Sequence, residues 1–374
     1  MSGENNIEIS FKDIAPYSEK EIHAALQFLK GSPDFKDGLR YFYPDYSDAL
    51  IERKLEKCNS CADFQVTFIE PIISNLIKKS INTFKITGLD VINKKDSHLY
   101  LSNHRDIFLD SGLLQYSLYH HGYDFTEISL GDNLIVNPLI ERVAKLNNMY
   151  TVFRKGNKLE KLDNAKNLSA YLRYALTQKK VSAWIAHGNG RAKDGNDQTF
   201  PGLIRMLMMS GTSDYKKSLS ELNIVVESVS YQYEPCVLEK AVECHIKETT
   251  GSYTKYKGEN VEHILKGIEQ YKGNVSLHLE KLNVEYIDFC GTPKEIIANI
   301  TAEIDRVVYS NYQLYNTNYM ALDVLENTNK YSAFYTETDL NSFKTYLKKL
   351  TEENHLQKRI LQLYAQPVLN KEKC

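Results

Sequence analysis

The 374-residue sequence has no apolar run of the roughly 18 residues that a bilayer-spanning helix needs. Its start, MSGENNIEISFKD, is polar and acidic, and it lacks the basic residues and apolar stretch of a signal peptide. We therefore expect a cytoplasmic protein that contacts membranes only at their surface.

Strong charge of one sign is also missing. The formal net charge is -2 and the isoelectric point is about 6.6. Because the whole molecule has no excess of positive charge to attract nucleic acid, we expect no nucleic-acid partner, and any site for an anion must be local.

Cysteine is scarce, and its spacing does not indicate a metal site. Six cysteines are scattered along the chain, and the CxxC formed by Cys58 and Cys61 is followed by no second CxxC and no histidine pair at zinc spacing. Hydrophobic residues make up 42% of the sequence, which can fill a large core without disulfides. These features indicate a reduced intracellular protein, and we expect no bound metal.

What the sequence does contain is an alternation of strand and helix patterns in its middle part. Apolar runs rich in β-formers predict strands, and apolar residues at helical spacing predict helices. The expected strands are 84–92, 99–102, 125–130, 149–153, 181–186 and 224–231, and the expected helices are 19–30, 63–79 with a kink or break at Pro71, 107–119, 163–178, 293–309, 319–327, 340–349 and 352–364. This order favours an α/β fold with a mixed, largely parallel central sheet covered by helices.

The same pattern divides the chain into three parts. We expect a helical segment over residues 1–80 packed on the core, an α/β domain over 81–290 and a second helical segment over 291–374. Packing on the core is the simpler explanation for the helix at 63–79, and the alternative is a helix that lies on a membrane surface.

The most informative motif is LYLSNHRDIFLDSG, over residues 99–112. A short apolar strand leads to His104, and a helical pattern begins directly after it, so His104 should face a cleft at a strand-to-helix junction. Asp110 lies about one and two-thirds helical turns further on, where its carboxylate could hold one imidazole nitrogen and leave the other free to accept a proton. A helix N-terminus nearby would also disfavour the charged imidazolium. Taken alone, such a pair is more often structural than catalytic.

A second motif places two cations at the end of a strand. Residues 131–141, GDNLIVNPLIE, precede the strand MYTVF, which leads into Arg154 and Lys155. Ligands usually bind at the carboxyl ends of strands in such sheets, and arginine suits bidentate contact with phosphate. The alternative is a solvated strand end.

A third motif, VSAWIAHGNGRAKDG over residues 181–195, runs from a buried strand into a glycine-rich loop that presents Arg191 and Lys193. Glycines let backbone amides approach a ligand closely, although this loop matches neither a P-loop nor a dinucleotide fingerprint. The fourth motif, residues 224–235, is a strand that lines the same cleft or, more simply, a core strand.

In this order, the four motifs resemble the bacterial glycerol-3-phosphate and 1-acylglycerol-3-phosphate (lysophosphatidate) acyltransferase family over roughly residues 80–290, in a branch with an Asn-His-x5-Asp signature, here Asn103-His104 to Asp110. The resemblance implies that residues 81–290 form an acyltransferase domain, that Asp110 holds His104 as a base, and that Arg154 and Arg191 bind an acceptor phosphate. We expect further residues of these motifs to contact substrate: Asn103, Arg105, Lys155, Asn189, Gly190 and Lys193.

The sequence departs from the commoner family pattern in two places. The commoner spacing would put the acid at Leu109, so Asp110 must act, and Asp106 competes with it. Where the family has Glu-Gly before its arginine, this chain has Asn189-Gly190, and asparagine cannot carry a charge. A catalytically degenerate lipid-binding or scaffold protein with the same fold therefore stays open as the alternative. A hydrolase would need a nucleophile elbow or a metal site, and the sequence indicates neither.

On the acyltransferase hypothesis, His104 takes the proton of an acceptor hydroxyl as that oxygen attacks a thioester carbonyl. We expect acyl-CoA or acyl carrier protein as the acyl donor, no other cofactor, and a lysophospholipid or related glycerolipid as the acceptor. Backbone amides over 188–190 are candidates for an oxyanion site. Because both substrates are amphiphiles, we expect peripheral contact with the inner face of the cell membrane, through the aromatic-rich N-terminal helices.

Overall fold

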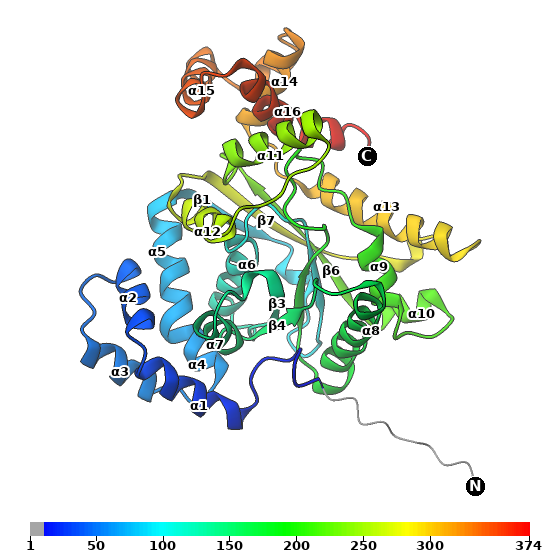
Figure 1. The fold of residues 1–374 in the computed structure, drawn as a ribbon. Helices are drawn as coiled ribbons and strands as arrows, with labels where there is room; N and C mark the ends of the chain where they lie inside the picture. The colour runs from blue at the N-terminus through cyan, green and yellow to red at the C-terminus, as the bar shows by residue number, and fades with distance from the viewer. Residues whose placement is uncertain (1–10) are drawn as a thin grey trace.

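The computed structural model describes residues 11–374, and a twisted sheet runs through its middle (Figure 1). Residues 1–10, which hold most of the polar start of the sequence, lie outside the described residues. The sheet has seven strands in the order β1-β7-β6-β2-β5-β3-β4. The strands are β1 (Ile81–Thr87), β2 (Leu99–Ser102), β3 (Glu127–Gly131), β4 (Met149–Val152), β5 (Ala183–Ala186), β6 (Ile224–Tyr231) and β7 (Gly273–Lys281).

Within this sheet, β6 and β7 are antiparallel and every other neighbouring pair is parallel. The expected α/β class with a mixed, largely parallel sheet is therefore confirmed. Ser102, the last residue of β2, lies level with Ala186 of β5 and Glu227 of β6. The loops that follow β2, β3, β4 and β5 consequently open onto one edge of the sheet, where ligands bind in folds of this kind.

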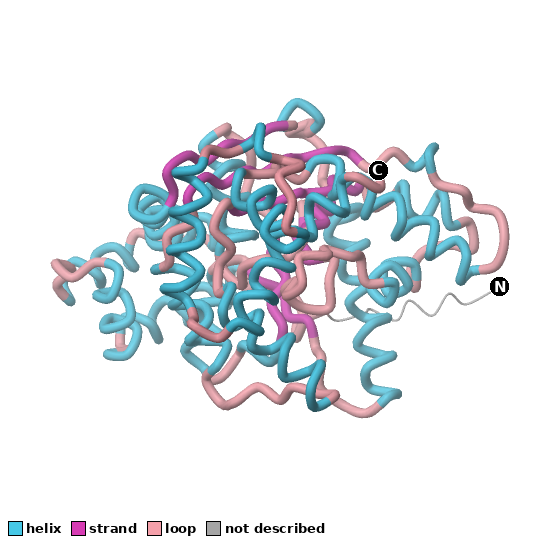
Figure 2. The backbone as a smooth tube through the Cα atoms, turned by 90° about the horizontal axis from the view of Figure 1, so that it is seen from above, coloured by secondary structure: helices cyan, strands magenta, loops and turns pink. Residues whose placement is uncertain are grey.

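Helices cover both faces of the sheet (Figures 1 and 2). Because successive side chains of a strand point to opposite faces, Leu99 and Leu101 of β2 join one buried apolar cluster and Tyr100 joins another. The first face packs against α8 (Lys158–Tyr174), α9 (Pro201–Met208) and α13 (Pro293–Asn311), and the second against α5 (Glu70–Ser80) and α6 (Leu109–His120).

Smaller helical clusters lie at the two ends of the chain. The N-terminal one contains α1 (Glu19–Lys30), α2 (Pro33–Phe42), α3 (Asp48–Glu56) and α4 (Cys61–Phe64), and it packs against α7 (Pro138–Leu146). The C-terminal one contains α14 (Asn316–Glu326), α15 (Glu337–Leu350) and α16 (Asn354–Lys371), and it shares its apolar core with α11 (Val237–Thr250). The remaining helices are α10 (Tyr215–Ser220) and α12 (Glu259–Glu269). Because α11 comes from residues 81–290, the C-terminal cluster draws on both sides of the expected boundary near residue 290. That boundary stays a prediction.

Several expected elements differ from the structure in detail. The helix expected over 63–79 continues from α4 through a π-helical turn (Gln65–Ile69) into α5, and Pro71 is the second residue of α5, directly after the π-turn. The expected interruption is therefore the π-turn that precedes the proline. β7 is missing from the expected strands, although its buried Val275, Leu277 and Leu279 alternate as in a strand. Among the described residues, no helix combines the length and the apolar character that crossing a bilayer requires.

Candidate active site

His104 follows the central strand β2, and its ring is held by a buried carboxylate. Nδ1 of His104 lies 2.8 Å from Oδ2 of Asp110, in the first turn of α6. The same oxygen accepts the backbone N–H groups of Arg105 at 2.6 Å and Asp106 at 2.9 Å, and Oδ1 accepts the hydroxyl of Tyr231 at 2.8 Å. A carboxylate bonded by so many donors acts as an acceptor, so Nδ1 carries the hydrogen and Nε2 keeps its lone pair.

Asp106, the competing acid, has another role. Its Oδ1 accepts the backbone N–H groups of Phe108 at 2.9 Å and Leu109 at 2.8 Å, so it caps the start of α6. Burial raises the pKa of the Asp106 carboxyl, and the charge of Asp110 raises it further. No hydrogen bond joins Asp106 to His104 among residues 11–374, and Asp110 is the acid that meets the imidazole.

Trp184 of β5 forms the wall beside the His104 ring. The two rings meet edge to face, with their centroids 6.2 Å apart. The indole Nε1 donates to Oε2 of Glu227 at 2.8 Å, and burial raises the pKa of that carboxyl well above its ordinary value. Glu227 thereby fixes the orientation of the indole beside the base.

The loop after β5 is joined to the His104 loop by backbone hydrogen bonds. The amide of His187 donates to the carbonyl of Ser102, and the amide of Ala192 donates to the carbonyl of His104, each over 2.7 Å. Between these anchors, Gly190 has a φ of 100°, a left-handed conformation that favours glycine. The backbone amides of residues 188–190 make no backbone hydrogen bond within the described structure, so they are free to donate to a bound group.

His187 is a site residue whose role the sequence does not reveal. Its ring is buried, and Nδ1 lies 3.0 Å from the Thr199 hydroxyl. Burial lowers the pKa of His187 to about 3, with a further lowering by the neighbouring His104. His187 is thus a neutral imidazole in the floor of the cleft. The only sequence signal for it is its place directly after a buried strand.

Two cavities of different character meet at His104, Gly188 and Asn189. The larger, of about 520 Å³, is mainly apolar and extends between β3, β4, α8 and α9; Leu130, Val152, Ala165, Leu168, Leu203 and Met206 are among its lining residues. The smaller, of about 340 Å³, is polar and is lined by Arg191, Lys193 and Lys247. His104 therefore stands where an apolar chain and a charged group can meet.

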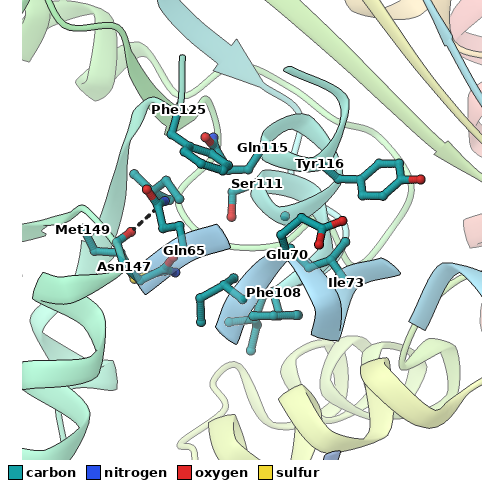
Figure 3. A pocket seen from close by; sticks show the side chains of 14 residues that line it. Gln65, Glu70, Ile73, Phe108, Ser111, Gln115, Tyr116, Phe125, Asn147 and Met149 are labelled. Atoms are coloured by element: carbon teal, nitrogen blue, oxygen red, sulfur yellow. Dashed lines mark hydrogen bonds between the residues drawn. The ribbon is translucent and has the colours of Figure 1, made fainter. Parts of the chain in front are cut away.

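A third, small cavity lies behind the inner wall of the apolar one. It measures about 30 Å³ and shares Ile107, Ser111, Ile128 and Met149 with the larger cavity. Gln65 and Asn147 line its floor, where the Gln65 amide nitrogen donates to the Asn147 carbonyl over 3.3 Å (Figure 3). Such a volume holds about one water molecule.

Asn103 is not placed to bind substrate, contrary to the expectation. Its side-chain nitrogen donates to the carbonyl of Val229 at 3.0 Å, and its oxygen accepts the amide of the same residue at 2.8 Å. The side chain is buried, so this pair of bonds fastens the end of β2 to β6. Its function in the fold is structural, because both of its polar atoms are bonded to the backbone of Val229.

Arg105 is also a correction, because its guanidinium turns away from the cleft. Its Nε donates to Asp197 at 2.9 Å and its Nη1 to Glu234 at 3.3 Å, and the side chain is fully buried. Lys240 of α11 completes the cluster by donating to the Arg105 carbonyl at 2.6 Å and by pairing with Glu234. Two cations and two carboxylates thus balance, and they hold the His104 loop from behind.

Most of the remaining expected residues line one or both of the two cavities. Arg154 lines the apolar cavity, and Gly131 makes room for it, since a Cβ there would lie 3.2 Å from Arg154 Nε. Arg191 and Lys193 line the polar cavity together with Gly190. Lys155 is exposed and lines neither. Arg154 and Arg191 therefore line two different cavities that adjoin at His104, and a phosphate site shared by the two arginines stays a prediction.

No protein-family model matches this chain, and no curated protein matches it. Among solved structures, the chain is similar to the 1-acyl-sn-glycerophosphate acyltransferase PlsC of Thermotoga maritima, with 12% identity, a TM-score of 0.38, and 78% of this chain and 96% of that chain covered. It is also similar to chloroplast FtsY of Physcomitrella patens (13% identity, TM-score 0.24, covering 75% and 95%) and to the signal recognition particle receptor FtsY of Elizabethkingia anophelis (12%, 0.23, 80% and 97%). Similarities this low identify neither a family nor an activity.

Proposed function

We propose that this protein is an acyltransferase that moves a fatty acyl group from a thioester donor to the hydroxyl of a lysophospholipid or related glycerolipid. The observation that carries the proposal is the position of His104, whose Nδ1 is held by buried Asp110 at the junction of the apolar and the polar cavity. The resemblance of the four sequence motifs to the lysophosphatidate acyltransferase family supports the same reaction.

In the proposed reaction, His104 Nε2 removes the proton from the acceptor hydroxyl as its oxygen attacks the thioester carbonyl. Asp110 stabilises the imidazolium that forms, which is the usual function of a carboxylate behind a catalytic histidine. The tetrahedral intermediate then collapses, the bond between carbon and sulfur breaks, and the imidazolium returns the proton to the leaving thiolate. Donors at residues 188–190 are suited to the oxyanion because their amides are free.

The two cavities support an assignment of the substrate parts. The apolar cavity is suited to the acyl chain, because burying each CH₂ group contributes about 0.8 kcal/mol. Arg191 and Lys193 are suited to the anionic headgroup of the acceptor. Arg154, at the wall of the apolar cavity, is available to a second anionic group, such as a phosphate of the donor. Either acyl-CoA or acyl carrier protein can serve as the acyl donor in this proposal.

The N-terminal helices are the proposed contact with the inner face of the cell membrane. Phe28 on α1 and Tyr41 on α2 are large aromatic side chains that are exposed at 41% and 49%. Aromatic side chains of this kind can enter a lipid surface and bring the site to its amphiphilic substrates.

The test is acyl transfer from labelled acyl-CoA and acyl carrier protein to a panel of lysolipids. Wild type should form ester, and His104→Ala should lose it, while exposed His355→Ala should retain it as the matched control. Equal ester formation by wild type and His104→Ala would contradict the proposed base.

A degenerate lipid-binding protein is the second candidate, and Asn189 is the observation that favours it. This amide lines both cavities at the position where the family resemblance implies a carboxylate. Lysolipid binding by wild type without ester on any acceptor would support this candidate. Asn189→Glu would then be the variant to assay for transfer.

A further inference from the structure

The mouth of the apolar cavity is surrounded by large apolar side chains that the fold leaves exposed. Phe153, which follows β4, and Phe200, which precedes α9, line this cavity and are themselves exposed. Leu159 and Leu162 lie near the start of α8, and Val136 lies just before α7; Leu159 and Val136 are exposed at 73% and 63%. We call these five side chains the rim. Apolar groups gathered on one surface in this way indicate a contact with a lipid or protein partner.

The segments that carry the rim are joined to one another. The backbone amide of Arg154 donates to Oδ1 of Asp132 over 3.1 Å, which ties the segment after β4 to the segment after β3. Leu134, two residues before Val136, lines the same cavity as Phe153. The rim is therefore one surface around one opening.

Positive charge is concentrated beside these apolar side chains. Residues 154–161 contain four cations and one carboxylate, in a chain whose formal net charge is -2. The carboxylate, Glu160, accepts the backbone amide at the N-cap of α8. Lys155, Lys158 and Lys161 are exposed, and no ion pair among residues 11–374 includes them. Cations interleaved with apolar side chains are complementary to an anionic lipid surface, because the cations meet its headgroups while the apolar groups enter the edge of its hydrocarbon layer.

The surface extends from the rim to the N-terminal helices. Val136 leads into α7, and Arg142 of α7 lies over the ring of exposed Phe28 on α1, 4.0 Å from its centroid. The helix that is proposed to contact the membrane is therefore linked to the rim through α7. A bilayer can cover such an extended surface and bring its acyl chains to the opening of the cavity.

We propose that the rim, together with Lys155, Lys158 and Lys161, docks on an anionic lipid bilayer, so that the apolar cavity opens directly into the membrane. This inference deepens the proposed function and rests on it, because the cavity is the proposed acyl site. It places the membrane contact at the mouth of the site itself, in the segments after β3 and β4, and not only in the N-terminal helices. The acyl chain then enters from the bilayer without crossing water.

The test is sedimentation of the full chain with lipid vesicles, without an acyl donor. Wild type should bind vesicles of equal parts phosphatidylglycerol and phosphatidylcholine more tightly than vesicles of phosphatidylcholine alone, and added salt should weaken this binding. Lys158→Ala should bind the anionic vesicles about five-fold more weakly, because the attraction of one lysine is lost. Leu159→Ser should bind both kinds of vesicle about ten-fold more weakly, because less apolar surface enters the lipid.

Lys344→Ala on α15 and Leu265→Ser on α12 are the matched controls. Each removes the same kind of exposed side chain from outside the rim, so both should bind vesicles as wild type does. No vesicle binding by wild type, or equal weakening by the rim variants and their controls, would overturn the proposal. If wild type binds acyl carrier protein through Lys158 and binds no vesicles, the rim contacts an acidic protein and the membrane assignment is wrong.

The proposed function fails separately from the docking surface. Vesicle binding is measured without transfer, and His104→Ala should bind vesicles as wild type does. Vesicle binding that depends on Lys158 and Leu159, without ester formed on any acceptor, would refute the reaction and retain the docking surface.

Discussion

Tyr231 donates its hydroxyl hydrogen to Oδ1 of Asp110 over 2.8 Å, while His104 contacts Oδ2 of the same carboxylate. The two side chains thus hold the acid from opposite sides. Tyr231 lies at the end of β6 and is fully buried, so its hydroxyl has no water to replace Asp110. The orientation of the candidate base therefore depends on a strand far from the His104 motif in sequence.

Tyr231→Phe should consequently weaken both stability and transfer. Loss of one hydrogen bond to a buried carboxylate should lower the free energy of unfolding by about 1.5 to 3 kcal/mol. We expect kcat to fall roughly ten-fold with KM little changed, since the proposed defect lies in the base. Denaturant unfolding and steady-state kinetics measure the two effects. An unchanged kcat would show that Tyr231 only supports the fold.

Asp110→Asn should reduce kcat by about 10³- to 10⁴-fold. An amide can donate to Nδ1 of His104 and so favour the imidazole tautomer that carries its hydrogen on Nε2, the nitrogen that is proposed to accept the proton. Asp106→Asn is the matched control. Asparagine also caps helices well, so this variant should keep α6 and retain transfer. Equal losses in the two variants would mean that general disruption of the loop, and not the imidazole contact, is responsible.

Ala165→Phe tests the apolar cavity. Ala165 lines this cavity from α8, so a phenyl group there should fill part of it and reduce transfer of long acyl chains more than short ones. Ala170→Phe, on the same helix but outside this cavity, should leave the chain-length profile unchanged. A profile that Ala165→Phe does not alter would place the acyl chain elsewhere. The measurement is transfer from donors of graded chain length.

The central strands and the His104–Asp110 pair were predictable because their signals are local. Strands buried on both faces appear as continuous apolar runs, and Asp110 stands only six residues after His104, although the loop before α6, and not helix geometry, brings the two side chains together. α11 and α12 were not predicted. Their buried faces carry Lys240, Glu243 and His263, which resemble surface residues in the sequence and are buried only because distant partners satisfy them.

The same reason explains the errors at Asn103 and Arg105. A polar residue beside a catalytic motif suggests a substrate ligand, yet Asn103 is satisfied by Val229, and Arg105 by Asp197 and Glu234. These partners are about 90 to 130 residues away in the chain. Only the folded arrangement shows that the polar atoms of both side chains already have partners within the protein.

The buried neutral His187 should make stability depend on pH. Its pKa is about 3 in the folded protein, against about 6.5 in an unfolded chain, so the unfolded state binds more protons between these values. Stability is therefore complete above pH 6.5 and is lost as the pH falls toward 3, by about 2 kcal/mol between pH 7 and pH 5 from this residue. Denaturant unfolding at the two pH values should show that His187→Gln loses less stability on acidification than wild type does. Exposed His355→Gln should keep the wild-type pH dependence. If His187→Gln also keeps it, then His187 is not the residue that takes up the proton on unfolding.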